Sequence, residues 1–275
     1  MITIERNELL DALNAVSKAV CGRTTMAILE CVCLTTTGST LILESNNMEF
    51  AIRKEIPCFS DKEAVCINAK RLLDILKKLP DTEITLEIDK SFAVTLSAGK
   101  KIKFCVPGLS PETFPFAKEE DGEKLIIEAE ALKEAIAGVS FCTATTETNK
   151  LMTGELFEIK NNHLKIVSLD GHRIAIRRME LKKDYADRKV VVPGKTLNEI
   201  SKILSGEMDD VVSIFFTNNH ILFEFDQTMV VSRLIEGEYF RIDQMLSSDY
   251  ETKIKINKKE FLDCIDRATL LVREG

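Results

Sequence analysis

The stretch Ile4-Glu5-Arg6-Asn7-Glu8-Leu9 decides the fold, because its pattern returns along the chain. An apolar strand residue is followed five positions later by the first apolar residue of a helix, and further apolar residues come four and seven positions after that. The same arrangement starts again at Ile67, Ile127 and Ile256, and a closely similar one starts at Val192, where the further apolar residues come three and seven positions after Leu197. Ile127 lies 123 residues after Ile4, and Ile256 lies 129 residues after Ile127. Because a solenoid repeats about every 20–50 residues, this longer spacing indicates duplicated domains.

Each predicted domain contains two half-units, and each half-unit has a strand, a helix and further strands. The further strands show alternating apolar and polar residues, which is typical of a strand with one buried face. Six such strands are predicted, at 84–88, 92–96, 101–106, 211–216, 221–225 and 229–234. The short turns between them favour antiparallel pairing. We therefore predict an α+β fold, in which two helices pack on antiparallel sheets and the halves of a domain are related by an approximate two-fold axis.

Domain boundaries follow from composition. The segment Ala117–Lys124 is charged and poor in apolar residues, which predicts an inter-domain linker. With 275 residues the chain exceeds the size at which one core keeps growing. We predict a first domain at 1–122, a second at 123–249 and the start of a third at 250–275. Because this third copy has only its opening strand and helix, we expect the chain to be a fragment whose last helix lacks a complete core.

Composition restricts the class of protein. The formal charge is −7, with 44 acidic and 37 basic residues, and a net negative charge taken alone argues against nucleic-acid binding. The sequence has no apolar stretch of the length that a membrane helix needs, and Glu5 and Arg6 make the N-terminus unlike a signal peptide. We therefore expect a cytoplasmic protein with no membrane partner.

The eight cysteines show no Cys-x-x-Cys pair and no Cys/His cluster, so we expect no metal and no cofactor. Cys31 and Cys33 alternate along a predicted strand and would point to one face. Cys105, Cys142 and Cys264 stand among apolar residues. We interpret the cysteines as small buried hydrophobic residues in a reducing cytosol.

Basic residues gather around the predicted helices, and acidic residues dominate the linker and the turns. The basic set includes Arg23, Lys70, Arg71, Lys195 and Lys202. If the helices share one surface, that surface is basic and suits an acidic partner. Ordinary solvated helix faces would give the same pattern, so charge leaves both interpretations open.

Four motifs, in their order and spacing, resemble the bacterial replicative sliding clamp, the beta subunit of DNA polymerase III. They are Cys21–Leu29, Ser168–Ala175, Val190–Lys195 and Leu234–Phe240. The resemblance covers the whole chain. It implies repeated DNA-clamp domains that encircle double-stranded DNA and tether the replicative polymerase without catalysing a reaction. Family members have three such domains in each chain, and two chains close head-to-tail into a homodimer ring.

The resemblance also implies a DNA site. Arg23 and Lys195 match positions on the inner surface of the ring, and Asn149 and Lys150 lie in a loop that matches another DNA-contacting segment. We add the helix residues Lys70 and Arg71 to this predicted site. Lysine and arginine that contact phosphates without reading bases give sequence-independent, salt-sensitive binding, which permits sliding.

A second implied site is a hydrophobic pocket that receives short peptide motifs from the polymerase, the clamp loader and repair proteins. The matching residues are Met152, Leu169, Gly171, His172, Arg173, Ile174, Phe240 and Met245. Flexible methionine and aliphatic side chains accept varied apolar anchors, while Arg173 and His172 can hold polar groups at the rim. Phe240 departs from the proline of many members, and in the family the third domain supplies the opposite wall.

Two other functions are weighed against this one. Asp170, His172 and Arg173 superficially resemble a catalytic triplet, but Asp-Gly-His is also a common turn. No Gly-rich phosphate loop, metal-ligand spacing or Gly-x-Ser-x-Gly elbow accompanies it. A peptide-binding adaptor without a DNA role would keep the pocket and make the helix lysines incidental. Changing Lys195 and Arg23 to Glu separates the clamp from the adaptor, because only the clamp would lose DNA retention.

Overall fold

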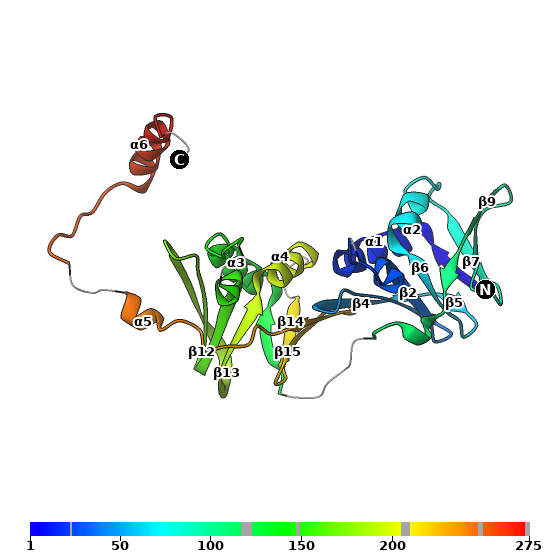
Figure 1. Ribbon diagram of the computed structural model, residues 1–275, viewed down its shortest axis with the longest axis horizontal. Coiled ribbons are helices and arrows are strands. Elements are labelled where there is room, and N and C mark those ends of the chain that lie inside the picture. The colour runs from blue at the N-terminus through cyan, green and yellow to red at the C-terminus, as the bar shows by residue number, and fades with distance from the viewer. Residues whose placement is uncertain (23, 117–122, 147–148, 205–209, 247–249, 273–275) are drawn as a thin grey trace. The chain divides into compact units, whose positions relative to one another are not determined.

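The computed structural model describes residues 1–22, 24–116, 123–146, 149–204, 210–246 and 250–272. The chain divides into two compact units, Met1–Gly237 and Glu238–Gly275 (Figure 1). Arg23, most of the predicted linker and the predicted boundary near 249 lie outside the described residues. The domain limits at 122 and 249 stay predictions.

Each long helix of the first unit directly follows a strand, as the repeat predicts. These helices are α1 (Arg6–Val16), α2 (Ala69–Leu76), α3 (Ala129–Ser140) and α4 (Gly194–Ile203). Short 3-10 turns lie between other elements, at η1 (Ser17–Ala19), η2 (Ala27–Glu30), η3 (Pro111–Thr113) and η4 (Lys150–Thr153). Helix α1 contacts α2, and α3 contacts α4.

The strands of the first unit form three antiparallel sheets, so the predicted α+β class is confirmed. The five-stranded sheet has the order β5 (Phe59–Ser60), β1 (Ile2–Glu5), β7 (Glu83–Ile88), β8 (Val94–Ala98) and β9 (Ile102–Val106). The nine-stranded sheet has the order β10 (Gly108–Leu109), β6 (Ala64–Asn68), β2 (Cys31–Thr36), β3 (Thr40–Asn46), β4 (Phe50–Pro57), β16 (Thr228–Arg233), β15 (His220–Phe225), β14 (Val211–Phe216) and β11 (Leu125–Glu128). The third sheet pairs β12 (Gly154–Leu169) with β13 (Ile174–Pro193).

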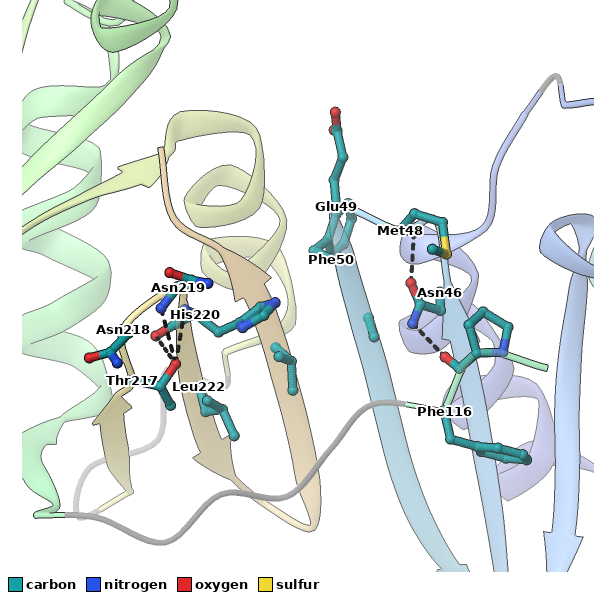
Figure 2. A pocket seen from close by; sticks show the side chains of 13 residues that line it. Asn46, Met48, Glu49, Phe50, Phe116, Thr217, Asn218, Asn219, His220 and Leu222 are labelled. Atoms are coloured by element: carbon teal, nitrogen blue, oxygen red, sulfur yellow. Dashed lines mark hydrogen bonds between the residues drawn. The ribbon is translucent and has the colours of Figure 1, made fainter. Parts of the chain in front are cut away.

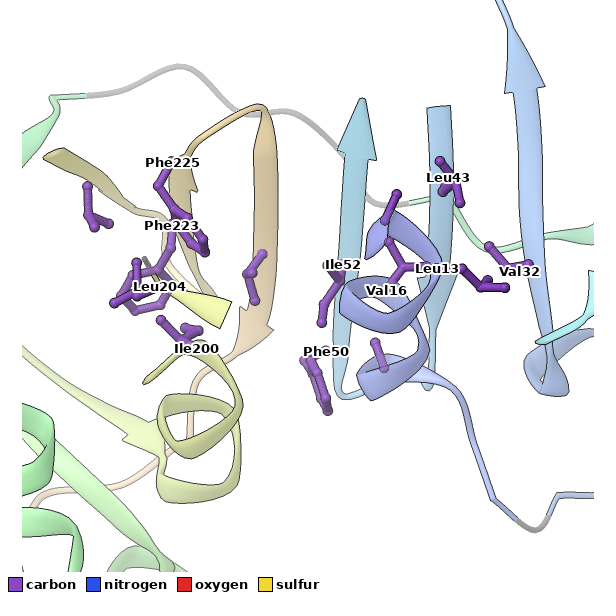
Figure 3. Close-up of a cluster of buried hydrophobic side chains, with 14 of the residues drawn as sticks. Leu13, Val16, Val32, Leu43, Phe50, Ile52, Ile200, Leu204, Phe223 and Phe225 are labelled. Atoms are coloured by element: carbon purple, nitrogen blue, oxygen red, sulfur yellow. The ribbon is translucent and has the colours of Figure 1, made fainter. Parts of the chain in front are cut away.

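The apolar stripe of each helix packs on these sheets. On α1 the buried residues include Leu13 and Val16, which lie against Leu43 of β3 and Ile52 of β4 (Figure 3). Burial of each such aliphatic side chain contributes roughly 1.5–3 kcal/mol. The spacing of four and seven positions therefore predicted the buried face of α1 correctly.

The repeat extends to single hydrogen bonds. Ser45 of β3 donates its hydroxyl to the carbonyl of Val16, and Ser168 of β12 donates to the carbonyl of Val139. Each bond joins residues 29 positions apart, and all four residues are buried. Ser168 follows Ser45 by 123 positions, the same spacing that separates Ile127 from Ile4, so the two serines are equivalent in the two repeats. Each hydroxyl provides a hydrogen-bond donor for a carbonyl at the C-terminal end of the helix in its own repeat.

The nine-stranded sheet passes from one repeat to the other through β4 and β16. These strands pair from Phe50 with Ser232 to Lys54 with Thr228, and the Lys54 ammonium also lies 3.0 Å from a carboxylate oxygen of Asp226. The alternating pattern predicted each strand, but it did not predict this pairing.

One predicted strand was wrong at its start. Phe92 was placed in a strand at 92–96, but it has a φ of 63° and lies in a turn. The Asp89 carboxylate accepts hydrogen bonds from the backbone N–H groups of Ser91 and Ala93 at 2.7 and 2.9 Å. In this Asx-type turn the Asp89 side chain takes the backbone N–H groups that would otherwise form hydrogen bonds between strands, so β8 starts at Val94.

The burial predicted for the cysteines is right for some and wrong for others. Cys31, Cys33 and Cys142 are buried, whereas Cys105 and Cys264 are exposed. Cys105 lies on β9, the last strand of the five-stranded sheet, so among the described strands only β8 pairs with it. Cys264 lies on a helix of the second unit whose apolar side chains are exposed.

The second unit contains α5 (Ile242–Met245) and α6 (Lys258–Thr269). The Asn257 carboxamide oxygen caps α6 by accepting from the N–H groups of Lys259 and Glu260 at 2.9 and 3.2 Å. Phe261 and Ile265, the stripe of the fifth repeat, are about half exposed. Among the described residues, no helix is long and apolar enough to cross a membrane.

Candidate functional site

The start of α4 lies unusually close to its neighbours. A Cβ atom at Gly194 would come 2.7 Å from the Thr143 methyl carbon and 3.1 Å from the Thr153 carbonyl oxygen. Only glycine fits this contact without displacement. The close approach places Lys195, the exposed second residue of α4, beside the segments that contain Thr143 and Thr153.

The turn η4 is held in place by its own polar groups. Asn149 accepts a hydrogen bond from the backbone N–H of Leu151 at 3.1 Å, and the Thr153 hydroxyl donates to the carbonyl of Lys150 at 2.7 Å. The N–H of Ala144 donates to the carbonyl of Met152 at 2.9 Å, which fixes η4 beside the chain that leaves α3. The side chains of Asn149 and Lys150 remain exposed.

A cleft of about 860 Å³ brings basic side chains from three segments together. Its basic lining residues are Lys150, Lys195, Lys202 and Arg233. Glu199 pairs with Lys202 at 2.7 Å, and Glu236 pairs with Arg233 at 3.6 Å. No ion pair involves Lys150 or Lys195 among the residues that the structure describes. These two ammonium groups are therefore available to an anionic ligand.

Of the predicted DNA-site residues that the structure describes, Lys70, Arg71 and Asn149 are not among those that line this cleft. Lys70 and Arg71 are exposed on the first turn of α2, where the Asn68 side chain accepts from the N–H of Arg71 at 3.0 Å. Arg23 lies outside the described residues. Arg233 was missed, because its contribution depends on β16 pairing with β4, and no periodicity in the sequence indicates that pairing.

Glu155 is a buried acidic residue of β12 that pairs with Val192, next to the cleft-lining Pro193 and Gly194. Its side chain is fully buried, and neither carboxyl oxygen has a hydrogen-bond partner among the described residues. Burial raises the pKa of Glu155 to about 8, although the Thr143 hydroxyl lies close enough to oppose the shift. A carboxyl with this pKa is largely protonated at neutral pH.

The Asp170–Arg173 turn closes the β12–β13 hairpin. The Asp170 carboxylate accepts the backbone N–H groups of His172 and Arg173 at 3.1 and 3.0 Å, and the Arg173 guanidinium donates to it at 2.9 and 2.6 Å. These bonds, with the Arg173 side chain foremost, lower the pKa of Asp170 to about 2. Gly171 has a φ of 90°, which favours glycine. Asp170 thus shapes the turn, as the turn interpretation expected.

Six residues of the predicted peptide pocket belong to the first unit. Leu169 is buried and pairs with Ile174 across the hairpin, while His172 and Arg173 are exposed. The Arg173 guanidinium also lies 6.0 Å from the centre of the exposed Phe141 ring, a neighbour that the sequence did not indicate. Met152 is partly buried on η4, and Gly171 forms the turn.

The other two predicted pocket residues, Phe240 and Met245, belong to the second unit. The ring of Phe240 packs edge-to-face on Tyr239, with centroids 5.6 Å apart. Met245 ends α5 and is half exposed. The complete pocket therefore stays a prediction.

A second cavity, of about 520 Å³, lies between the β3–β4 turn and the β14–β15 turn (Figure 2). Asn46 donates to the carbonyl of Pro115 at 2.6 Å and accepts from the N–H of Met48 at 2.7 Å. Thr217 accepts from the N–H of His220 at 3.0 Å on the opposite side. None of the predicted site residues lines this cavity.

Among the described residues, no group of three or more His, Cys, Asp or Glu side chains could hold a metal ion. The two sites built above rely on lysine, arginine, apolar side chains and backbone amides.

Comparison with known proteins gives consistent matches over nearly the whole chain. Residues 1–118 match the family model of the DNA polymerase III beta subunit, N-terminal domain, and residues 126–240 match that of its central domain. The beta sliding clamps of Staphylococcus epidermidis and Staphylococcus aureus are 33% and 32% identical over 99% of this chain and 74% of their own length.

Solved structures agree with the sequence matches. A structure from Eubacterium rectale, described as a DNA polymerase III beta subunit, is 51% identical and has a TM-score of 0.95, covering 100% of this chain and 75% of that chain. The DNA polymerase sliding clamp of Bacillus subtilis is 29% identical and has a TM-score of 0.96, covering 100% of this chain and 74% of that one.

Proposed function

Because the chain belongs to the DNA polymerase III beta subunit family, that of the beta sliding clamps, we propose that it acts as a replicative sliding clamp. In this role it encircles double-stranded DNA in the cytoplasm and tethers the replicative polymerase, the clamp loader and repair proteins. The proposed role needs no catalysis, since a topological link alone keeps the polymerase at its template.

The observation that carries this proposal is the basic cleft beside α4. Lys150 and Lys195 line it without ion pairs among the described residues, although the chain as a whole is acidic. Two mobile point charges attract phosphates but read no bases, so contacts of this kind are independent of sequence and weaken with salt. Lys70, Arg71, Asn149 and Arg23 complete the proposed DNA surface.

The Asp170–Arg173 turn supports the proposed peptide pocket. Asp170 holds the backbone of the turn, so His172 and Arg173 are presented to solvent in a fixed arrangement next to the apolar Leu169 and Ile174. An apolar floor with a polar rim suits a short peptide that has an apolar anchor. We propose that Met152, Gly171, Phe240 and Met245 complete this pocket.

The edge of the five-stranded sheet supports a ring of two chains. β9 is the last strand of that sheet, and its Phe104 is 38% exposed. A strand at the edge of a sheet that carries an exposed aromatic residue favours pairing with another chain. We propose that this edge contributes to a head-to-tail homodimer.

Release from DNA ends tests the proposed function. The native protein is loaded by its clamp loader onto a nicked circular plasmid, and the plasmid is then cut once. We expect retention on the circle and loss from the linear form. Equal retention on both forms would show ordinary DNA binding, and retention on neither form, with peptide binding intact, would favour an adaptor.

A matched pair of charge reversals separates direct phosphate binding from topology. Lys195→Glu should lower DNA retention, and the slope of log affinity against log salt should fall by about one for each phosphate that the protein no longer neutralises. Lys101 is another exposed lysine, in the β8–β9 turn, and Lys101→Glu should leave both quantities unchanged. Binding of a polymerase peptide should persist in both variants.

A further inference from the structure

Glu155 stands out because it is a fully buried carboxyl that the proposed function does not yet use. It lies on β12 directly opposite Val192 of β13. The chain reaches Gly194, the first residue of α4, two positions after Val192. Burying an ionised carboxylate without partners is costly, so the neutral acid is the form that this environment stabilises.

A short series of contacts links Glu155 to the basic cleft. The Thr143 hydroxyl lies near enough to the Glu155 carboxyl to oppose the rise of its pKa. Its oxygen and both carboxyl oxygens are buried, and none of the three has a hydrogen-bond partner among the described residues. The methyl carbon of Thr143 packs against the position where Gly194 would carry a Cβ, at 2.7 Å. Thr143 and Gly194 both line the cleft beside Lys195. A change at Glu155 therefore reaches Lys195 through two packed residues.

The charged groups around this cleft determine what the carboxyl meets if it ionises. They are Lys150 of η4, Lys195, Glu199 and Lys202 of α4, Arg233 of β16, and Glu49 and Glu236 of the adjoining turns. Lys202 and Arg233 already pair with Glu199 and Glu236. The Cys142 thiol, next to Thr143 in sequence, interacts with Asp170 and Arg173 instead.

We propose that Glu155 is a positioning residue for the DNA-binding cleft, and that its neutral form holds the start of α4 so that Lys195 meets a DNA phosphate. This inference rests on the proposed clamp function. Loss of the proton places a negative charge behind the cleft, where it attracts Lys150 and Lys195 inward, repels phosphate and loosens the contact between Thr143 and Gly194. The raised pKa of Glu155 sets this change between about pH 7 and 9.

DNA binding across this pH range is the first test. Wild-type protein and Glu155→Gln, a neutral variant of the same shape, are titrated with a fluorescent duplex at low ionic strength. Wild-type affinity should fall by about fourfold from pH 7 to pH 9, the effect of one added charge near a protein surface. The Gln variant should lack this fall, and it controls for every other group that titrates. Identical pH profiles in the two proteins would overturn the proposal.

A second readout needs no DNA. The ¹³C-methyl resonance of Thr143 and the amide resonance of Gly194 should shift with pH in the wild type and should not do so in Glu155→Gln. If neither resonance shifts in the wild type, the link from Glu155 to α4 is disproved. If both shift but no DNA binds at any pH, the clamp function fails and the positioning role falls with it, a result distinct from the first.

Discussion

The Lys18 ammonium lies 3.3 Å from a carboxylate oxygen of Glu199 and links η1 of the first repeat to α4 of the second. The other oxygen of Glu199 receives Lys202 at 2.7 Å. Burial acts to raise the pKa of Glu199, but hydrogen bonds from Lys202 and Lys18 outweigh it and hold that pKa below its ordinary value. The two repeats thus share a charged contact in addition to the sheet between them.

We expect a double-mutant cycle of Lys18→Ala and Glu199→Ala to give a coupling energy of about 0.5–1 kcal/mol, because the pair is only partly buried. Urea unfolding at neutral pH measures it. Since the folded pKa of Glu199 is lowered, its contribution is present above the unfolded pKa and is lost as pH falls through the folded value. A coupling that stayed constant from neutral pH to pH 3 would contradict this account.

Replacing Gly194 with Ala should destabilise the protein by about 1–3 kcal/mol, because the new methyl group overlaps Thr143 and the carbonyl of Thr153. DNA affinity should fall as well, since the start of α4 must move. Gly138→Ala in α3 is the matched control: nothing lies within 4 Å of its added Cβ, and the helix should gain about 0.5–1 kcal/mol. Thermal unfolding measures the stability of both variants, and DNA titration measures their affinity. If Gly194→Ala has the stability and DNA affinity of the wild type, the packing around Gly194 is not tight.

Glu155→Gln should be more stable than the wild type at pH 7 by on the order of 3 kcal/mol, because the wild-type folded state must keep a proton that the unfolded state releases. The raised pKa of Glu155, about 8 against an ordinary 4.5, gives the sign. The wild type has its full stability below pH 4.5 and loses part of it as pH rises toward 8. Chemical unfolding of both proteins at pH 4, 7 and 9 tests this, and parallel stability curves would contradict it.

Asp170→Ala should lower affinity for a short polymerase peptide by roughly three- to tenfold, the equivalent of one missing hydrogen bond. The variant removes both the acceptor for the turn amides and the partner of Arg173. Asp170→Asn keeps the amide acceptor and should weaken binding less. Because the pKa of Asp170 is about 2, this group should cause no pH dependence between pH 4 and 8. Fluorescence anisotropy measures the affinities, and an equal decrease in both variants would place the effect on the charge alone.

Local pattern predicted the elements well, because helix and strand periods are properties of consecutive residues. The stripes of α1, α2, α3 and α4 are buried as expected. The error at Phe92 arose where the Asp89 side chain competes with the backbone ladder, an effect that alternation does not register.

Contacts between distant segments were harder to predict. The cleft needs η4, α4 and β16 at one place, and the pairing of β16 with β4 has no signal in either strand alone. Glu155 stands in a strand among apolar residues, and periodicity alone does not distinguish a buried acid from an exposed one. Cys105 was wrongly predicted to be buried for a related reason, since apolar and polar residues alternate in an edge strand as they do in a central strand.

The pairing of β4 with β16 also has a mechanical consequence. Bending the chain between its two repeats would break consecutive backbone hydrogen bonds from Phe50 to Lys54 at the same time. The connection between the repeats is therefore stiff and should not act as a hinge. Force applied at one end of this unit, for example by a protein that pries a ring apart, is transmitted to the other end with little loss. If two chains form the proposed ring, we expect it to open at a place where no strand pairing of this kind crosses.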